Sequence, residues 1–314
     1  MPRWMSSLLA QVLNHLAADT ACRLGGSLGI LAWYLGIRRS VVSYYLQRCL
    51  GLRGRARQRI ARRSYATLGA TFLELWTVGG PDGPERHLEI LTPRWQRSLH
   101  QRYPACIYVS PHIGAWDIGG HGLQRHAERM LVYAKAQHSA EIDRVTNLQR
   151  ERLGFRVLMA RHGDRTAALS SLRGLRSGTS LALLTDQKPA DEESELGIFL
   201  DQTTNCHRGP AFFAQRAKLP VVPAFCVRRR AGRCVLFVGR PLPLDDGHLT
   251  QHVMDCYSAM IGAFPGQYFW HHKRFPRPAL APAAALPGVM PLATLSQRRS
   301  AIALPAAASA SAQT

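Results

Sequence analysis

An apolar run leads directly into a histidine-containing turn in the segment Ala105-Cys106-Ile107-Tyr108-Val109-Ser110-Pro111-His112-Ile113-Gly114-Ala115-Trp116-Asp117. The run over residues 105–109 is typical of a buried strand, and the Pro-His pair followed by Gly114 ends it. Ligands of α/β sheets collect at the carboxyl ends of the strands. The segment therefore predicts an accessible imidazole at the edge of an α/β sheet.

His112 and Asp117 stand five residues apart, so on one continuous helix they would diverge by about 140°. A turn through Gly114 instead allows the carboxylate to fold back onto one ring nitrogen and leaves the other as a base. This would be half of a catalytic triad, with a substrate hydroxyl in place of the serine. On spacing alone, a solvated or hydrogen-bonded loop histidine is the more common explanation of such a pattern.

Short apolar runs alternate with amphipathic segments between residues 86 and 275, which predicts an α/β core with a mostly parallel central sheet flanked by helices. The expected strands are 105–110, 130–134, 155–159, 180–184, 221–226 and 234–238. The expected helices are 118–129, 140–153, 165–176, one around 211–217, and 249–264. Residues 276–314 are rich in Pro, Ala and Ser and are expected to be disordered.

Residues 1–85 are expected to form a helical, basic segment that associates with a membrane. Residues 24–36 are apolar, but they are fewer than the ~20 needed to cross a bilayer as a helix. We expect them to dip into one leaflet, with nearby tyrosines and Trp33 at the headgroups. A buried helix of the globular core and a short spanning helix are the alternatives.

The chain carries a formal net charge of +20, and no acidic residue occurs between Asp19 and Glu74. Such a block favours an anionic partner: a membrane surface with anionic lipids, an acidic protein or nucleic acid. The arginines border an apolar, aromatic stretch, and no helix-turn-helix, zinc or RNA-stacking signature is present, so we expect no nucleic acid. A nucleic-acid-binding basic protein remains the non-enzymatic alternative, with salt-sensitive DNA binding as its test.

Seven scattered cysteines lack the Cys-x2-Cys spacing of metal sites, and we expect reduced, mostly buried thiols without a disulfide framework. The histidines likewise lack companion ligands, so no metal is expected. Nothing in the sequence indicates a nucleophile elbow of the Gly-x-Ser-x-Gly type, in which a strand turns sharply into a helix, and this disfavours a serine hydrolase.

Four further segments follow the Pro-His motif in a characteristic order. They are Leu184-Thr185-Asp186-Gln187, Arg208-Gly209-Pro210-Ala211-Phe212-Phe213-Ala214, Leu219-Pro220-Val221-Val222-Pro223 and Gln267-Tyr268-Phe269-Trp270-His271-His272-Lys273-Arg274-Phe275. With the basic N-terminal region, this order resembles the bacterial late acyltransferases of lipid A biosynthesis, the lauroyl and myristoyl transferases, within the lysophospholipid acyltransferase superfamily. The resemblance covers most of residues 5 to 275.

The resemblance implies transfer of a fatty acyl group from acyl carrier protein or coenzyme A to a lipid hydroxyl, with no other cofactor, at the cytoplasmic face of the inner membrane. It makes His112 the general base and Asp117 its acidic partner. Lipid A enzymes often carry glutamate at the second position, and the form found here is also similar to acyltransferases of phosphatidylinositol mannosides. The acceptor therefore stays open between a lipid A precursor and another glycolipid, an aminolipid or a lysophospholipid.

Arg150 and Arg152 match a family arginine pair thought to handle substrate phosphate, a task that suits the planar guanidinium fork. A surface helix with an internal Glu-Arg pair accounts for them equally well.

Five further residues are assigned to substrate binding. Asp186 and Gln187 are expected to shape the pocket rather than to act chemically. Backbone N–H groups or Arg208 would stabilise the oxyanion that forms when the acceptor attacks the thioester. Gly114 and Trp116 are expected to fix the shape of the motif.

Overall fold

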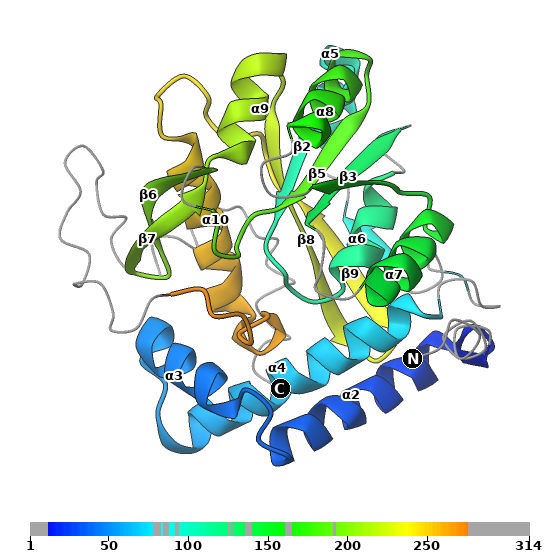
Figure 1. The fold of residues 1–314 in the computed structure, drawn as a ribbon, viewed down its shortest axis with the longest axis vertical. Coiled ribbons are helices and arrows are strands. Elements are labelled where there is room, and N and C mark those ends of the chain that lie inside the picture. The colour runs from blue at the N-terminus through cyan, green and yellow to red at the C-terminus, as the bar shows by residue number, and fades with distance from the viewer. Residues whose placement is uncertain are drawn as a thin grey trace.

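The computed structural model describes residues 12–77, 83, 88–91, 94–124, 127, 129–135, 140–160, 165–190 and 193–275. Helices surround a central sheet (Figure 1). The helices are α2 (Ala18–Tyr34), α3 (Arg39–Leu50), α4 (Gly54–Leu75), α5 (Arg94–Arg102), α6 (Trp116–Leu123), α7 (Ala140–Arg152), α8 (Thr166–Arg176), α9 (Gly209–Ala217), α10 (Leu249–Ala263) and the 3-10 helix η3 (Pro265–Gln267). The strands are β1 (Leu88–Leu91), β2 (Ile107–Ser110), β3 (Met130–Lys135), β4 (Arg156–Ala160), β5 (Ser180–Leu184), β6 (Ser194–Phe199), β7 (Gln202–His207), β8 (Val221–Arg230) and β9 (Arg233–Val238).

The central sheet has seven strands in the order β1-β9-β8-β2-β5-β3-β4. Neighbours from β8 to β4 run parallel, whereas β9 runs antiparallel to β8 and parallel to β1. β6 and β7 form a separate antiparallel pair. The predicted α/β class with a mostly parallel central sheet is therefore confirmed.

Both faces of the sheet are buried along its central strands, which explains why β2 and β5 are continuous apolar runs. Along β2, Ile107 and Val109 belong to one hydrophobic cluster, and Tyr108 belongs to the other. The first cluster includes residues of α9 and α10, and the second includes Ile118 of α6. β2 thus lies in the middle of the sheet with helices on both sides, and its carboxyl end points to the region between these layers.

The N-terminal region is helical, and it packs on the core rather than standing apart from it. Trp33 of α2 and Tyr65 of α4 belong to the same hydrophobic cluster as Val109 of β2. α2 and α4 cross closely because glycines meet there: a Cβ added to Gly25 would lie 2.4 Å from the carbonyl oxygen of Gly69. No helix within the described ranges is long and apolar enough to cross a membrane.

The structure also contains elements that the sequence did not predict. β1 and α5 precede the His112 segment, and the β6–β7 hairpin lies between β5 and α9. β1 is a four-residue strand with an exposed middle position, and β7 alternates between partly buried and buried residues, so neither shows a long apolar run. α6 begins at Trp116 and ends at Leu123, earlier at both ends than the expected helix over 118–129. The tail at 276–314 lies outside the described residues.

We predict opposite effects for alanine at two adjacent positions of α2. Gly25→Ala should lower the free energy of unfolding by about 1–3 kcal/mol, because its Cβ overpacks the α4 backbone. Gly26→Ala meets only ordinary contacts at 3.7 Å and should raise that free energy by roughly 0.5–1 kcal/mol, because alanine favours a helix over glycine. Urea denaturation of both variants checks this, and equal effects would contradict the glycine contact.

Candidate active site

His112 and Asp186 meet at the carboxyl ends of two adjacent parallel strands. His112 follows β2 and Asp186 follows β5, and in the sheet Ser110 lies opposite Leu184. The Nδ1 atom of His112 lies 2.7 Å from Oδ1 of Asp186. The carboxylate side chain is 1% exposed, whereas the imidazole side chain is 18% exposed. The ring is therefore held by a buried carboxylate while part of it remains accessible.

The electrostatics of this pair favour an ionised Asp186. Burial by itself raises the pKa of the carboxyl group, but the charge and the hydrogen bond of His112 outweigh burial and hold the pKa below its ordinary value. Tyr268 lies in the same environment, where burial and then the charge of Asp186 raise the pKa of its hydroxyl well above the ordinary value. The carboxylate thus stays charged at neutral pH and can stabilise a protonated imidazole.

A segment near the C-terminal end of the described chain holds the His112 loop in shape. The amide of Phe269 donates to the His112 carbonyl at 3.0 Å, and the amide of Gly114 donates to the Gln267 carbonyl at 2.9 Å. Gly114 has a φ of 59°, and an added Cβ would lie 2.1 Å from the carbonyl oxygen of Cys226. Only glycine fits there, because any side chain would strike the β8 backbone.

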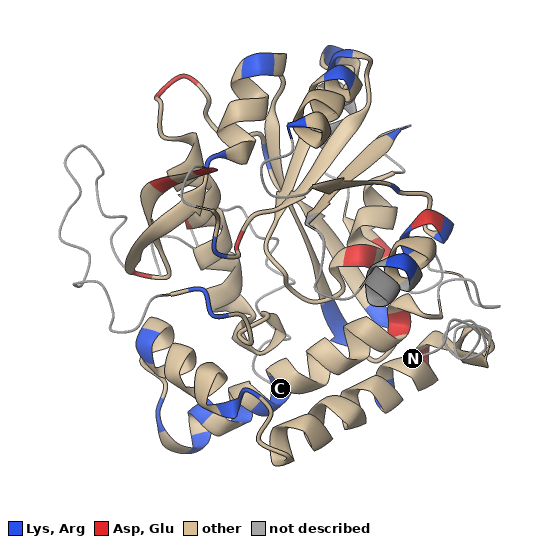
Figure 2. Cartoon of the chain, in the orientation of Figure 1, with Lys and Arg blue, Asp and Glu red and all other residues tan. Residues whose placement is uncertain are grey.

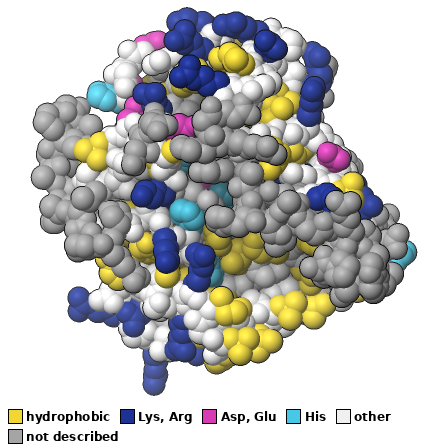
Figure 3. Space-filling view, viewed as in Figure 1, with side chains coloured by type: hydrophobic (Ala, Val, Ile, Leu, Met, Phe, Trp, Pro, Cys, Tyr) yellow, Lys and Arg dark blue, Asp and Glu magenta, His cyan; other side chains and the backbone are white. Residues whose placement is uncertain are grey.

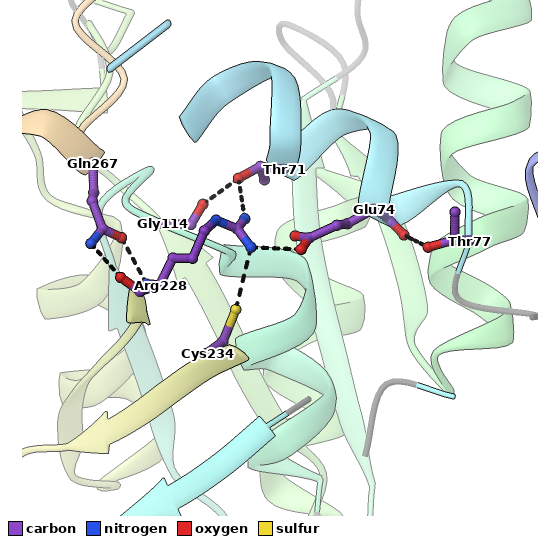
Figure 4. Close-up of polar contacts among 7 residues, drawn as sticks. All are labelled: Thr71, Glu74, Thr77, Gly114, Arg228, Cys234 and Gln267. Atoms are coloured by element: carbon purple, nitrogen blue, oxygen red, sulfur yellow. Dashed lines mark hydrogen bonds and ion pairs between the residues drawn. The ribbon is translucent and has the colours of Figure 1, made fainter. Parts of the chain in front are cut away.

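A buried ion pair fastens the same loop to α4 and β8 (Figure 4). Nη1 of Arg228 lies 2.6 Å from Oε1 of Glu74, and Nη2 donates to the Thr71 hydroxyl oxygen at 3.2 Å. The Thr71 hydroxyl in turn donates to the Gly114 carbonyl at 2.6 Å. The Gln267 side chain pairs with both backbone groups of Arg228, at 2.7 and 2.8 Å. The loop after His112 is thus tied to three separate parts of the chain.

Arg228 and Glu74 each stabilise the charge of the other. Burial alone would lower the pKa of Arg228, but the adjacent Glu74 carboxylate outweighs burial and raises it, so the guanidinium stays protonated. Glu74 is 2% exposed, so its charge depends on Arg228 for compensation.

The structure corrects the predicted pairing of His112 with Asp117. Oδ1 of Asp117 accepts a hydrogen bond from Nε of Arg150 at 2.8 Å, and the partner of His112 is Asp186. The reason is that α6 already begins at Trp116, so Asp117 lies in its first turn and reaches toward α7 instead of folding back. Asp186, expected only to shape the pocket, contacts the imidazole directly.

The remaining predicted site residues differ in whether they contact this pair. The Trp116 ring makes an edge contact with the His112 ring, with centroids 5.3 Å apart. Gln187 is partly buried directly after Asp186. Arg152 is exposed on α7 and donates to Gln149 at 3.3 Å, and Arg208 is exposed at the N-cap of α9. The contacts found for Arg152 and Arg208 link neither side chain to His112.

Sequence reasoning missed the residues that support the loop: Thr71, Glu74 and Arg228. One signal was available, since Glu74 is the first acidic residue after a long basic stretch and lies among apolar residues on its helix. Such a carboxylate, placed on a buried face, requires a cation, although the sequence does not say which one.

The chain matches the model of the bacterial lipid A biosynthesis acyltransferase family over residues 2–277. It belongs to this family. A search among curated proteins found no match. The resemblance drawn from the sequence motifs is confirmed, and membership makes the chain an acyltransferase acting on lipid A precursors, with an acyl thioester as donor and a lipid as acceptor.

The buried ion pair between Arg228 and Glu74 predicts that alanine substitutions of two glutamates in this lipid A acyltransferase have different effects on stability. Glu74→Ala leaves Arg228 buried without its countercharge and should lower the free energy of unfolding by about 3–5 kcal/mol. Glu89→Ala removes the partner of the neighbouring Arg229, a pair 3.5 Å apart and about half exposed, and should cost about 0–1 kcal/mol. Chemical denaturation of both variants measures the difference, and similar losses would argue against the ion pair.

Proposed function

We propose that this lipid A acyltransferase moves a fatty acyl group from acyl carrier protein or coenzyme A to a hydroxyl of a lipid A precursor, with His112 as the general base and Asp186 as its carboxylate partner. The observation that carries the proposal is the 2.7 Å contact between the His112 Nδ1 and Asp186 Oδ1. Because Nδ1 faces the carboxylate, Nε2 is the nitrogen that takes a proton from the acceptor.

The reaction needs no acyl-enzyme. The acceptor oxygen attacks the thioester carbonyl carbon while Nε2 of His112 takes its proton. When the tetrahedral intermediate collapses, the carbon–sulfur bond breaks and the imidazolium returns the proton to the departing thiolate. The products are an ester and a free thiol. The buried, ionised Asp186 fixes the ring tautomer and stabilises the imidazolium between these two transfers.

The oxyanion of that intermediate requires hydrogen-bond donors close to His112. The amides of Ile113, Gly114 and Ala115 already donate to backbone carbonyls. We therefore assign the contact to amides of the first turn of α6, which begins four residues after His112 and has a positive end of its dipole there. The sequence suggested either backbone N–H groups or Arg208 as donors, and the exposure of Arg208 makes it the weaker of the two.

The Asp117–Arg150 pair suits a binding role beside the reacting groups. Both side chains are at least four-fifths buried, and the carboxylate fixes one edge of the guanidinium through Nε. An arginine oriented in this way is suited to a phosphate group of the acceptor or of the donor's carrier arm. We assign Asp117 the orientation of Arg150 and not the orientation of His112.

We also propose that the N-terminal helices rest on the cytoplasmic face of the inner membrane. Large apolar side chains on α2 are half exposed or more, including Leu28, Leu31 and Tyr34. Figure 2 shows basic residues on α3 and at the start of α4, close to the end of α2. Exposed apolar groups next to arginines favour the boundary of an anionic bilayer, where each finds its preferred environment.

We predict that His112→Ala and Asp186→Asn each lower kcat for acyl transfer by about 10²–10⁴-fold, since the first removes the base and the second removes the charge that stabilises its protonated form. The measurement is the turnover of an acyl thioester with a lipid A precursor. Unfolding curves of both variants establish that the fold is kept.

Asp117→Asn is the matched comparison, because it neutralises a carboxylate in the same site that contacts Arg150. It should act mainly by raising KM. A kcat for Asp186→Asn near that of the wild type, together with a collapse of kcat for Asp117→Asn, would reverse the two assignments.

A further inference from the structure

A cavity of about 390 Å³ is lined mainly by residues of α2 and α4. Apart from His271, its lining consists of aliphatic, glycine and aromatic residues, among them Ala32, Leu68 and Trp76. Two lining residues, Leu28 and Phe72, are each 51% exposed, so the cavity opens at the protein surface. Figure 3 shows hydrophobic side chains gathered over this lower part of the molecule, where α2 and α4 lie. Its volume falls within the roughly 300–1,000 Å³ of ligand pockets.

His271 contributes the one imidazole ring among the residues that line this cavity. Its side chain is buried, with 5% of the residue exposed, and neither ring nitrogen has a partner within the part of the chain that the structure describes. Burial and then the charge of Arg38 lower its pKa to about 4, so at neutral pH the ring offers one N–H donor and one acceptor. The ring is fixed by an edge contact with Tyr65, with centroids 4.2 Å apart, and it stacks on Phe269. A rigid buried imidazole without partners in an otherwise apolar cavity is suited to a polar group on a ligand.

The cavity adjoins the catalytic pair through shared aromatic walls. Phe72, which lines it, makes an edge contact with Trp116 at 6.3 Å, and Trp116 in turn makes an edge contact with His112 at 5.3 Å. On the other side, Phe269 lies between His271 and His112, at 5.5 and 6.0 Å between ring centroids. A molecule bound in the cavity is therefore separated from the reacting imidazole by about one ring.

We infer that this cavity binds a hydrocarbon chain of the lipid acceptor, and that His271 hydrogen-bonds a hydroxyl or ester oxygen of that lipid. The inference rests on the proposed function. The acceptor is favoured over the thioester donor because the mouth of the cavity lies among the exposed apolar side chains of α2, the surface through which a bilayer lipid arrives. Each methylene buried there would tighten binding about fourfold.

The test compares two phenylalanine substitutions on α2 in the full-length enzyme. Ala32→Phe fills the cavity, whereas Ser27→Phe adds a ring at an exposed polar position of the same helix, outside the lining. With a lipid A precursor in detergent micelles, Ala32→Phe should raise the acceptor KM by about tenfold or more relative to the donor KM. Ser27→Phe should leave both within about twofold. A raised donor KM with an unchanged acceptor KM, or no change at all, overturns the inference.

His271→Phe provides a second test that does not depend on filling the cavity. It removes two unpartnered buried nitrogens and keeps a ring, so the variant should unfold at a higher temperature than the wild type while its acceptor KM rises. A histidine with a merely structural role would give a lower unfolding temperature and an unchanged acceptor KM, and that result overturns the inference. Thioester turnover by the wild type distinguishes failure of the proposed function from failure of the cavity inference. If the wild type shows no turnover, the proposed function fails. If it does turn over the thioester, the substitutions test only the assignment of the cavity.

Discussion

The buried contact between Arg228 and Glu74 is the constraint on which the active site depends. A charge that is 2% exposed is tolerated only beside its countercharge, so α4 and β8 must come together in one relative position. Thr71, one turn away on α4, then reaches the carbonyl of Gly114. The position of the loop behind His112 is in this way set by electrostatics in a helix that contributes no atom to the His112–Asp186 pair.

This arrangement explains what the sequence allowed us to predict. The apolar runs of β2 and β5 are each buried on both faces, so they were recognisable, and His112 at the end of β2 was recognisable with them. The partner of His112 depended on which strand lies beside β2. β3 and β4 follow β2 along the chain, but β5 is the strand that lies between β2 and β3 in the sheet. The pattern of apolar residues within each strand does not encode this strand order. The sequence pattern therefore favours Asp117, which is close to His112 along the chain, over Asp186, which is close to it in space.

The same limit applies to the N-terminal helices. Their apolar spacing indicated helices, but their partners were set by glycines that contribute no hydrophobic signal. Gly25 and Gly69 allow backbone contact between α2 and α4, and this contact leaves other apolar residues of α2 facing outward. A strongly basic region thus both packs against the catalytic core and carries an apolar surface. The sequence left these as competing possibilities, and the helix contacts make them compatible.

The contribution of Gln267 and Phe269 to the His112 loop has a consequence for the synthesis of the enzyme. Chains fold from the N-terminus as they leave the ribosome, so β2 and its histidine emerge long before these two residues do. Until they emerge, the carbonyl of His112 and the amide of Gly114 lack their backbone partners. Ribosome-bound intermediates and fragments that end before Gln267 would therefore carry the His112 imidazole in an incompletely formed loop, and this loop would be completed only after Phe269 has been added.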